Sequence, residues 1–170
     1  ATFAASQILD NNNATYSHTN SGADEWLKLS LTQPLGVEYV EQPLREGDRG
    51  GVELKRRSPI PVYVDEDCHT LADVAACQEV AHGINIKLAK SGGIREATRM
   101  VHAARSLGLG VMLGCMVESG LGIAAGCAVA PLCDHVDLDG NLLLAHDPAP
   151  GPSFVDGVQV ASEEPGLGCG

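Results

Sequence analysis

The sequence predicts an α/β fold in which about six parallel βα units curve into part of a barrel. Short β-rich apolar runs alternate with helix-like stretches, an order typical of a parallel sheet with crossover helices. Hydrophobic residues make up 44% of the chain but aromatic residues only 4%. The core must therefore consist of Val, Leu, Ile and Ala, which suits helices packed on a sheet. At 170 residues, the chain has the size of one domain.

The expected strands are apolar runs bounded by polar or turn-forming residues. The first expected strand ends near residue 9. The other expected strands cover residues 37–41, 60–65, 84–88, 109–116 and 136–139. The central run, 84–88, carries one lysine near its end and is followed by two glycines. Because side chains alternate along a strand, we expect Asn85, Lys87 and Ala89 on one face.

Helix-like stretches fill the intervals between these strands: 23–33, part of 48–57, 70–82, 93–107 and 119–130. The stretch 93–107 is the clearest, because its apolar residues recur on one face and Gly108 ends it. Thr70 is expected to be the N-cap of its helix, with Asp73 three residues on. After residue 140 the pattern weakens. Residues 142–144 are a candidate strand, so we expect a partial barrel at 1–146 and a Pro- and Gly-rich tail at 147–170.

Charge and composition argue against several classes of protein. A net charge of −11 does not suit nucleic-acid binding, which needs a basic patch. No apolar run reaches the roughly 20 residues that span a bilayer, and the N-terminus shows no signal-peptide pattern. The six cysteines form no CxxC pair and have apolar neighbours. They therefore suggest a reducing compartment, and we expect a cytoplasmic protein without a membrane partner.

Each of these apolar runs ends in a polar residue, and this residue falls on the same alternating face of the strand in each run. These residues are Asp10, Glu41, Asp65, Lys87 and the pair Asp137 and Asp139. In a (β/α) barrel, the carboxyl ends of the strands converge on one mouth, where active sites lie. Three convergent carboxylates repel one another unless a cation neutralises them, and carboxylate oxygens suit Mg²⁺. The spacing therefore predicts a Mg²⁺ site held by Asp10, Glu41 and Asp65.

The segments that carry these residues resemble the enolase superfamily, in particular the muconate-lactonising subgroup and its dipeptide epimerases. The matching segments are 37–44, 64–66, 84–94, 114–119 and 137–140. The resemblance implies a TIM-type barrel and Mg²⁺-dependent epimerisation of a small-molecule dipeptide through an enediolate. The implied role of Lys87 is acid/base chemistry at the substrate α-carbon. Asp137 and Asp139 would bind the dipeptide's ammonium group, and the backbone of Cys115, Met116 and Val117 would line the substrate.

Two residues near these motifs receive no role from the sequence. Lys90 lies on the other parity from Lys87, just past the strand, and we expect it to be a solvated loop lysine. Asp67 stands where the family more usually has a small hydroxyl residue.

The resemblance also shows departures. The family has a capping domain and two further strands before the first metal ligand, and one of these carries a Lys-x-Lys motif with the opposing acid/base. No Lys-x-Lys precedes Asp10, and the chain is shorter than the roughly 250 residues of a full barrel. We therefore expect a partial barrel without the capping domain and the first two strands.

Several functions remain open. The first is a dipeptide epimerase. The second is another reaction of the subgroup: cycloisomerisation, o-succinylbenzoate synthesis or N-acylamino acid racemisation. The third is a non-catalytic homologue whose open sheet edges pair with another chain, for example in a homo-oligomer.

Overall fold

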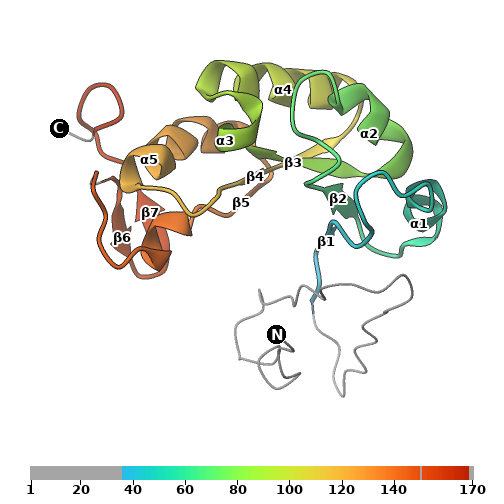
Figure 1. The fold of residues 1–170 in the computed structure, drawn as a ribbon, viewed down its shortest axis with the longest axis horizontal. Helices are drawn as coiled ribbons and strands as arrows, with labels where there is room; N and C mark the ends of the chain where they lie inside the picture. The colour runs from blue at the N-terminus through green and yellow to red at the C-terminus, as the bar shows by residue number, and fades with distance from the viewer. Residues whose placement is uncertain (1–35, 150, 169–170) are drawn as a thin grey trace. The chain divides into compact units, whose positions relative to one another are not determined.

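The computed structural model describes residues 36–149 and 151–168. Residues from Glu38 onward form one compact unit, and this unit is described by itself. It contains a five-stranded parallel sheet with helices between the strands (Figure 1). The strand expected to end near residue 9 and the helix expected at 23–33 lie outside the described residues.

The five strands follow one another across the sheet in chain order. They are β1 (Val40–Glu41), β2 (Val62–Val64), β3 (Gly83–Lys87), β4 (Gly110–Gly114) and β5 (His135–Val136). Each pairs in parallel with the next, as in the wall of a barrel. The unit is thus part of a TIM-type α/β barrel, as the sequence predicts, although most strands are shorter than expected.

Helices follow each of the first four strands. They are α1 (Gly51–Arg57), α2 (Val74–Val80), α3 (Leu88–Ser91), α4 (Ile94–Ser106) and α5 (Gly120–Val129). Figure 1 shows α2, α3 and α4 along one face of the sheet. The helices predicted within 48–57, 70–82, 93–107 and 119–130 are confirmed.

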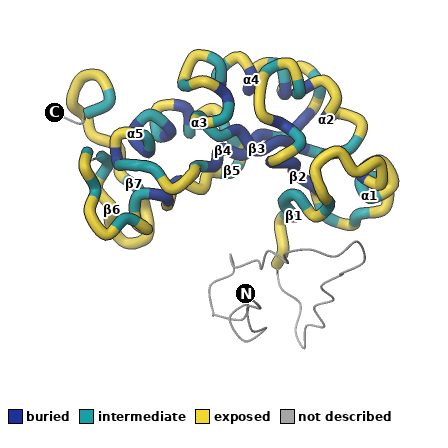
Figure 2. The backbone as a smooth tube through the Cα atoms, viewed as in Figure 1, coloured by how far each residue is buried: buried dark blue, intermediate teal, exposed yellow. Residues whose placement is uncertain are grey.

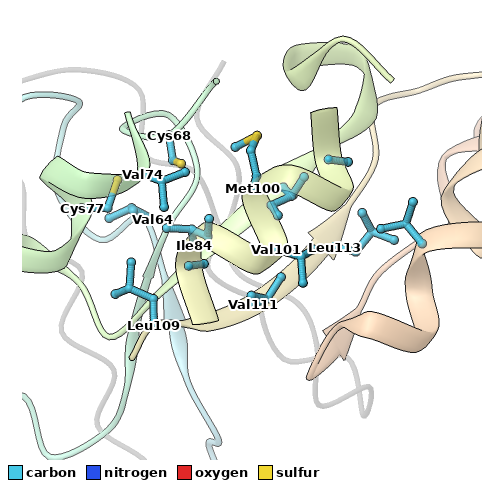
Figure 3. Close-up of a cluster of buried hydrophobic side chains, with 14 of the residues drawn as sticks. Val64, Cys68, Val74, Cys77, Ile84, Met100, Val101, Leu109, Val111 and Leu113 are labelled. Carbon is cyan, nitrogen blue, oxygen red and sulfur yellow. The ribbon is translucent and has the colours of Figure 1, made fainter. Parts of the chain in front are cut away.

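The hydrophobic core lies between the sheet and these helices. Ile84 of β3 and Val111 and Leu113 of β4 are fully buried against Met100 and Val101 of α4 (Figure 3). Figure 2 shows buried residues along β2, β3 and β4. Because side chains alternate along a strand, the residues between these apolar positions lie on the opposite face of the sheet.

The chain turns into a helix directly after Lys87, which corrects the expectation for Ala89. That residue lies in α3 and does not continue the face of Asn85 and Lys87. The short helix ends at Gly92 (φ 96°) and Gly93 (φ 102°), a left-handed backbone that favours glycine.

The predicted N-cap at Thr70 is wrong. Helix α2 begins later, at Val74, and Asp73 is the residue before it. The Asp73 carboxylate accepts hydrogen bonds from the backbone N–H of Thr70 (2.7 Å) and from its hydroxyl (2.9 Å). Thr70 therefore belongs to a turn that leads into the helix.

The C-terminal segment contains elements other than those expected from the sequence. The candidate strand at 142–144 is wrong, because Gly140–Leu143 forms a 3₁₀ helix, η3. A short 3₁₀ helix, η2 (Ala130–Leu132), also follows α5. In the expected tail, β6 (Ser153–Val155) and β7 (Val158–Val160) form an antiparallel hairpin. Its turn is Asp156-Gly157, both with positive φ, which is a strong hairpin signal that the sequence already carried.

Candidate functional site

The face of the sheet opposite the helices begins with a layer of three rings. Tyr39, Tyr63 and His135 contact one another, with ring centroids 4.4–5.5 Å apart. Each ring stands two residues before one of the acidic residues at the strand ends, so each acid follows on the same parity. The ring layer forms a floor beneath the acidic residues.

Two glycines make room for this floor. A Cβ on Gly83 would lie 2.3 Å from the Tyr63 ring, and a Cβ on Gly110 would lie 2.2 Å from its hydroxyl oxygen. Because atoms do not approach so closely, any side chain at these positions would push Tyr63 out of the layer. β3 and β4 therefore carry glycine where β1, β2 and β5 carry rings.

The Asp65 carboxylate, just past the end of β2, binds two lysines. Lys87 Nζ lies 2.8 Å from its Oδ2, and Lys90 Nζ lies 2.5 Å from its Oδ1. Lys90 also donates to the backbone oxygen of Asp65 at 2.7 Å. Burial raises the pKa of Asp65, but the hydrogen bonds from the two lysines outweigh burial and leave the pKa below its usual value.

Lys90 is therefore not a solvated loop lysine. Its side chain is only 11% exposed. The parity argument failed because α3 begins directly after Lys87, and the helix returns Lys90 to Asp65. The sequence contained no signal for this pairing.

Glu41, at the end of β1, is held by Asn85 of β3. The Asn85 amide Nδ2 donates to Glu41 Oε1 at 2.6 Å. Burial raises the pKa of Glu41, the Asn85 hydrogen bond opposes this, and the negative charge of Asp65 raises the pKa further. Asn85 is 1% exposed. Its Oδ1 has no hydrogen-bond partner among the described residues.

Gln42 joins the ends of β1 and β2, a role that sequence reasoning missed. Its Oε1 accepts the backbone N–H of Asp65 at 2.8 Å, and its Nε2 donates to Asp67 Oδ2 at 2.7 Å. Asp67 also accepts the backbone N–H of Gly47 at 2.7 Å. Asp67, which had no assigned role, thus fixes the loop after β1 and the amide that orients Asp65.

Gly114 leaves the space that Asn85 and Lys87 occupy. A Cβ on Gly114 would lie 2.7 Å from Asn85 Oδ1 and 3.1 Å from Lys87 Cε. Lys87 and Gly114 are register partners across β3 and β4. The absence of a side chain here lets the lysine cross toward the acidic residues.

Beyond β4, the loop at Cys115 meets the loop that follows β5. Cys115 Sγ accepts the backbone N–H of Gly140 at 3.3 Å and lies 3.8 Å from Asp139 Oδ1. A Cβ on Gly140 would clash with the Met116 backbone oxygen at 2.0 Å. Met116 and Val117 are exposed. The structure thus brings Cys115 and Met116 beside the Asp137–Asp139 segment.

Asp137 and Asp139 are both exposed, and neither forms an ion pair among the described residues. Partial burial of its carboxyl raises the pKa of Asp137, the charge of Asp139 raises it further, and the charge of Lys87 lowers it. Lys87 faces Gly114 across β3 and β4, and the backbone N–H of Asp137 donates to the oxygen of Leu113, the residue before Gly114.

The residues present suit part of a Mg²⁺ site. Asp10, the first expected ligand, lies outside the described residues. Within residues 36–149 and 151–168, no three acidic, His or Cys side chains form a metal-binding group. Glu41 and Asp65 nevertheless provide neighbouring carboxylates that repel each other, and carboxylate oxygens are the ligands that Mg²⁺ prefers.

Two further observations concern the sequence-based expectations. None of the described helices is long and apolar enough to cross a membrane. None of the five described cysteines forms a disulfide, and Cys68 and Cys77 are fully buried.

Known proteins resemble this chain. A hydrophobic dipeptide epimerase from Flavobacteria bacterium (strain MS024-2A) is 45% identical over 78% of the chain and 38% of that protein. An Agrobacterium tumefaciens enolase family member with homology to dipeptide epimerases, solved with sodium and L-Ala-L-Glu, is 38% identical with a TM-score of 0.67. That match covers 74% of this chain and 39% of the other.

A third similar protein is the N-succinyl Arg/Lys racemase from Bacillus cereus, with a TM-score of 0.72 and 28% identity. That match covers 78% of this chain and 37% of the racemase chain. The chain thus spans about two fifths of the length of these proteins. The family model described as "Enolase C-terminal domain-like" matches residues 6–170. With the strand-end acids and Lys87 at one edge of a parallel sheet, this match shows that the chain belongs to the enolase C-terminal domain-like family.

Proposed function

We propose that this chain forms the catalytic part of a Mg²⁺-dependent dipeptide epimerase that abstracts an α-proton and passes through an enediolate. One observation carries the proposal. The Lys87 ammonium contacts Asp65 at 2.8 Å, and Lys87 pairs in register with Gly114 of β4, next to Leu113, whose backbone oxygen accepts the N–H of Asp137. A proton-transferring group therefore lies between two sets of carboxylates that can bind opposite ends of a substrate.

In this proposal, Lys87 exchanges a proton with the substrate α-carbon. Its neutral amine takes the proton and its ammonium returns one. Asp10, Glu41 and Asp65 would hold Mg²⁺, which would supply positive charge to the substrate carboxylate. Asn85 keeps Glu41 oriented, and Lys90 keeps Asp65 in place.

Asp137 and Asp139 would bind the N-terminal ammonium of the dipeptide. Two carboxylates without an ion-pair partner among the described residues favour an incoming cation. The backbone at Cys115, Met116 and Val117 would line the substrate beside them. The names of the similar epimerases support a substrate with a free amino terminus.

A second candidate is racemisation of an N-acylated amino acid. The observation in its favour is the structural similarity to the N-succinyl Arg/Lys racemase. Such a substrate has no free ammonium at the acylated nitrogen, so it would not need the Asp137–Asp139 pair. Comparing free and N-acylated substrates separates the two candidates.

The test is α-proton exchange in D₂O, followed by proton NMR with Mg²⁺ present. The protein is the longest natural polypeptide that contains this chain, and L-Ala-L-Glu and more hydrophobic dipeptides are the substrates. We expect exchange in the wild type and a loss of about 10²–10⁴-fold in Lys87→Met. Lys55→Met is the matched control, because Lys55 is half-buried on α1 and its side chain donates only to the backbone oxygen of Gln78 among the contacts described for it.

The outcomes separate the readings. Exchange of N-acylated amino acids but not dipeptides would favour the racemase. No exchange from either isomer of any substrate would favour a non-catalytic homologue, and unchanged exchange in Lys87→Met would contradict the role of Lys87.

A further inference from the structure

The segment that carries Asp137 and Asp139 is anchored from the side opposite its carboxylates. Between them lies Leu138, whose side chain is 7% exposed and belongs to the hydrophobic core. It packs on α5 at Gly126, where a Cβ would lie 2.8 Å from Leu138 Cδ2. A glycine on the helix thus lets the leucine dock closely.

Gln159 of β7 holds the same segment by its backbone. Its Nε2 donates to the backbone oxygen of Leu138 at 3.0 Å and to Asn141 Oδ1 at 2.9 Å. These two contacts lie on either side of Asp139. One side chain from the C-terminal hairpin therefore spans the turn that presents the second aspartate.

The turn needs an anchor for two reasons. The strand β5 ends at Val136, and the backbone N–H of Asp137 makes the last bond to β4, with Leu113. Beyond that point the two aspartates repel each other. The pKa of Asp137 is raised first by partial burial of its carboxyl and then by the negative charge of Asp139. Without an anchor for this turn, the repulsion between the two carboxylates would let their side chains adopt varied positions.

We propose that Gln159 is a positioning residue for recognition of the substrate ammonium, acting through Leu138 and Asn141 on the Asp137–Asp139 pair. This inference rests on the proposed function, because it assumes that the pair binds an ammonium group. Gln159 itself touches no reacting atom. It therefore affects the binding of a free amino terminus and not proton transfer at Lys87.

The test compares two variants in the longest natural polypeptide that contains this chain. Gln159→Leu removes the donor, and Gln159→Glu keeps the shape but places a carboxylate against the Leu138 oxygen. Val158→Thr, on the same strand with an exposed side chain, is the control. The ligands are L-Ala-L-Glu, assayed as substrate, and N-acetyl-L-Ala-L-Glu, assayed as competitive inhibitor.

We expect both Gln159 variants to raise KM for L-Ala-L-Glu about tenfold, which corresponds to the loss of roughly one hydrogen bond. The kcat and the inhibition constant of the acetylated ligand should stay near the wild-type values. The unchanged inhibition constant also shows that the variant is folded.

Other outcomes overturn the inference in distinguishable ways. An equal rise in KM for L-Ala-L-Glu and in the inhibition constant of the acetylated ligand would mean that Gln159 only stabilises the fold. A KM equal to that of Val158→Thr would mean that the anchor does not matter. If the wild type neither binds nor turns over L-Ala-L-Glu, the proposed function fails, and the inference fails with it.

Discussion

Asp65 and the Asp137–Asp139 pair lie at the same edge of the sheet but differ in how their charge is balanced. Asp65 is 7% exposed, and both of its oxygens accept a lysine ammonium. Asp137 and Asp139 are exposed and form no ion pair among the described residues. The first acid has its counter-charges within the fold, and the second pair does not.

The difference follows from the cost of burying charge. A buried carboxylate without a partner is strongly unfavourable, so Asp65 depends on Lys87 and Lys90. Exposed carboxylates keep their water and need no built-in partner. Asp65 is therefore neutralised within the fold, while Asp137 and Asp139 are the residues that the proposed function leaves for a cationic group of the substrate.

Removing Lys90 should have the largest effect on stability. We expect Lys90→Met to lower the free energy of unfolding by about 2 kcal/mol, because Asp65 would keep only Lys87 as a cationic partner. Urea denaturation measures the change, with Lys55→Met, a lysine that has no carboxylate partner among the described ion pairs, as control. A loss no larger than that of the control would show that Asp65 does not depend on this lysine.

An added methyl group at Gly114 should disturb the site with a smaller effect on stability. Gly114→Ala would place a Cβ against Asn85 and Lys87, and we expect a cost of about 1–2 kcal/mol. α-Proton exchange should fall as well, because Lys87 must move. Gly36→Ala is the control, since no atom of the described residues lies within 4 Å of its Cβ position. Equal exchange rates in the two variants would argue against the close fit at Gly114.

The smallest predicted effect is pH-dependent and lies away from the strand ends that carry the acids. His82 Nδ1 accepts the backbone N–H of Val62 at 3.0 Å, and burial and then Lys55 hold the pKa of His82 below its usual value. A lowered pKa means that stability is present above the unfolded pKa, about 6.5, and is lost as the pH falls through the folded value.

We therefore expect the wild type to lose less than about 1 kcal/mol of stability through His82 between pH 7 and pH 5, because solvent screens the charge of this partly exposed side chain. In His82→Asn, whose side-chain oxygen can accept the same N–H, this loss should be absent. Denaturation at both pH values measures it. An identical pH dependence in the two proteins would assign the effect to groups other than His82. Once the contribution of His82 is known, the pH response of Asp65 and of the Asp137–Asp139 pair can be measured separately from it.

The sequence by itself determined the alternation of strands and helices from β1 to α5 and the face of the residues within each strand. Strand alternation gives Tyr39, Tyr63 and His135 the parity of the acids two residues on, and in the structure their rings are in contact. Local patterns suffice here because strand and helix periodicity depend on neighbouring residues. The Asp156-Gly157 hairpin carried an equally local signal, although the sequence analysis did not use it.

Only the tertiary structure decided which polar groups pair across the chain. Lys90 binds Asp65 because α3 starts one residue after β3 ends, and Gln42 and Gln159 reach residues that are more than 15 positions away. Such contacts depend on how strands and loops meet in space, where the need to satisfy buried charges and amides selects one arrangement. No periodicity in the sequence encodes that choice.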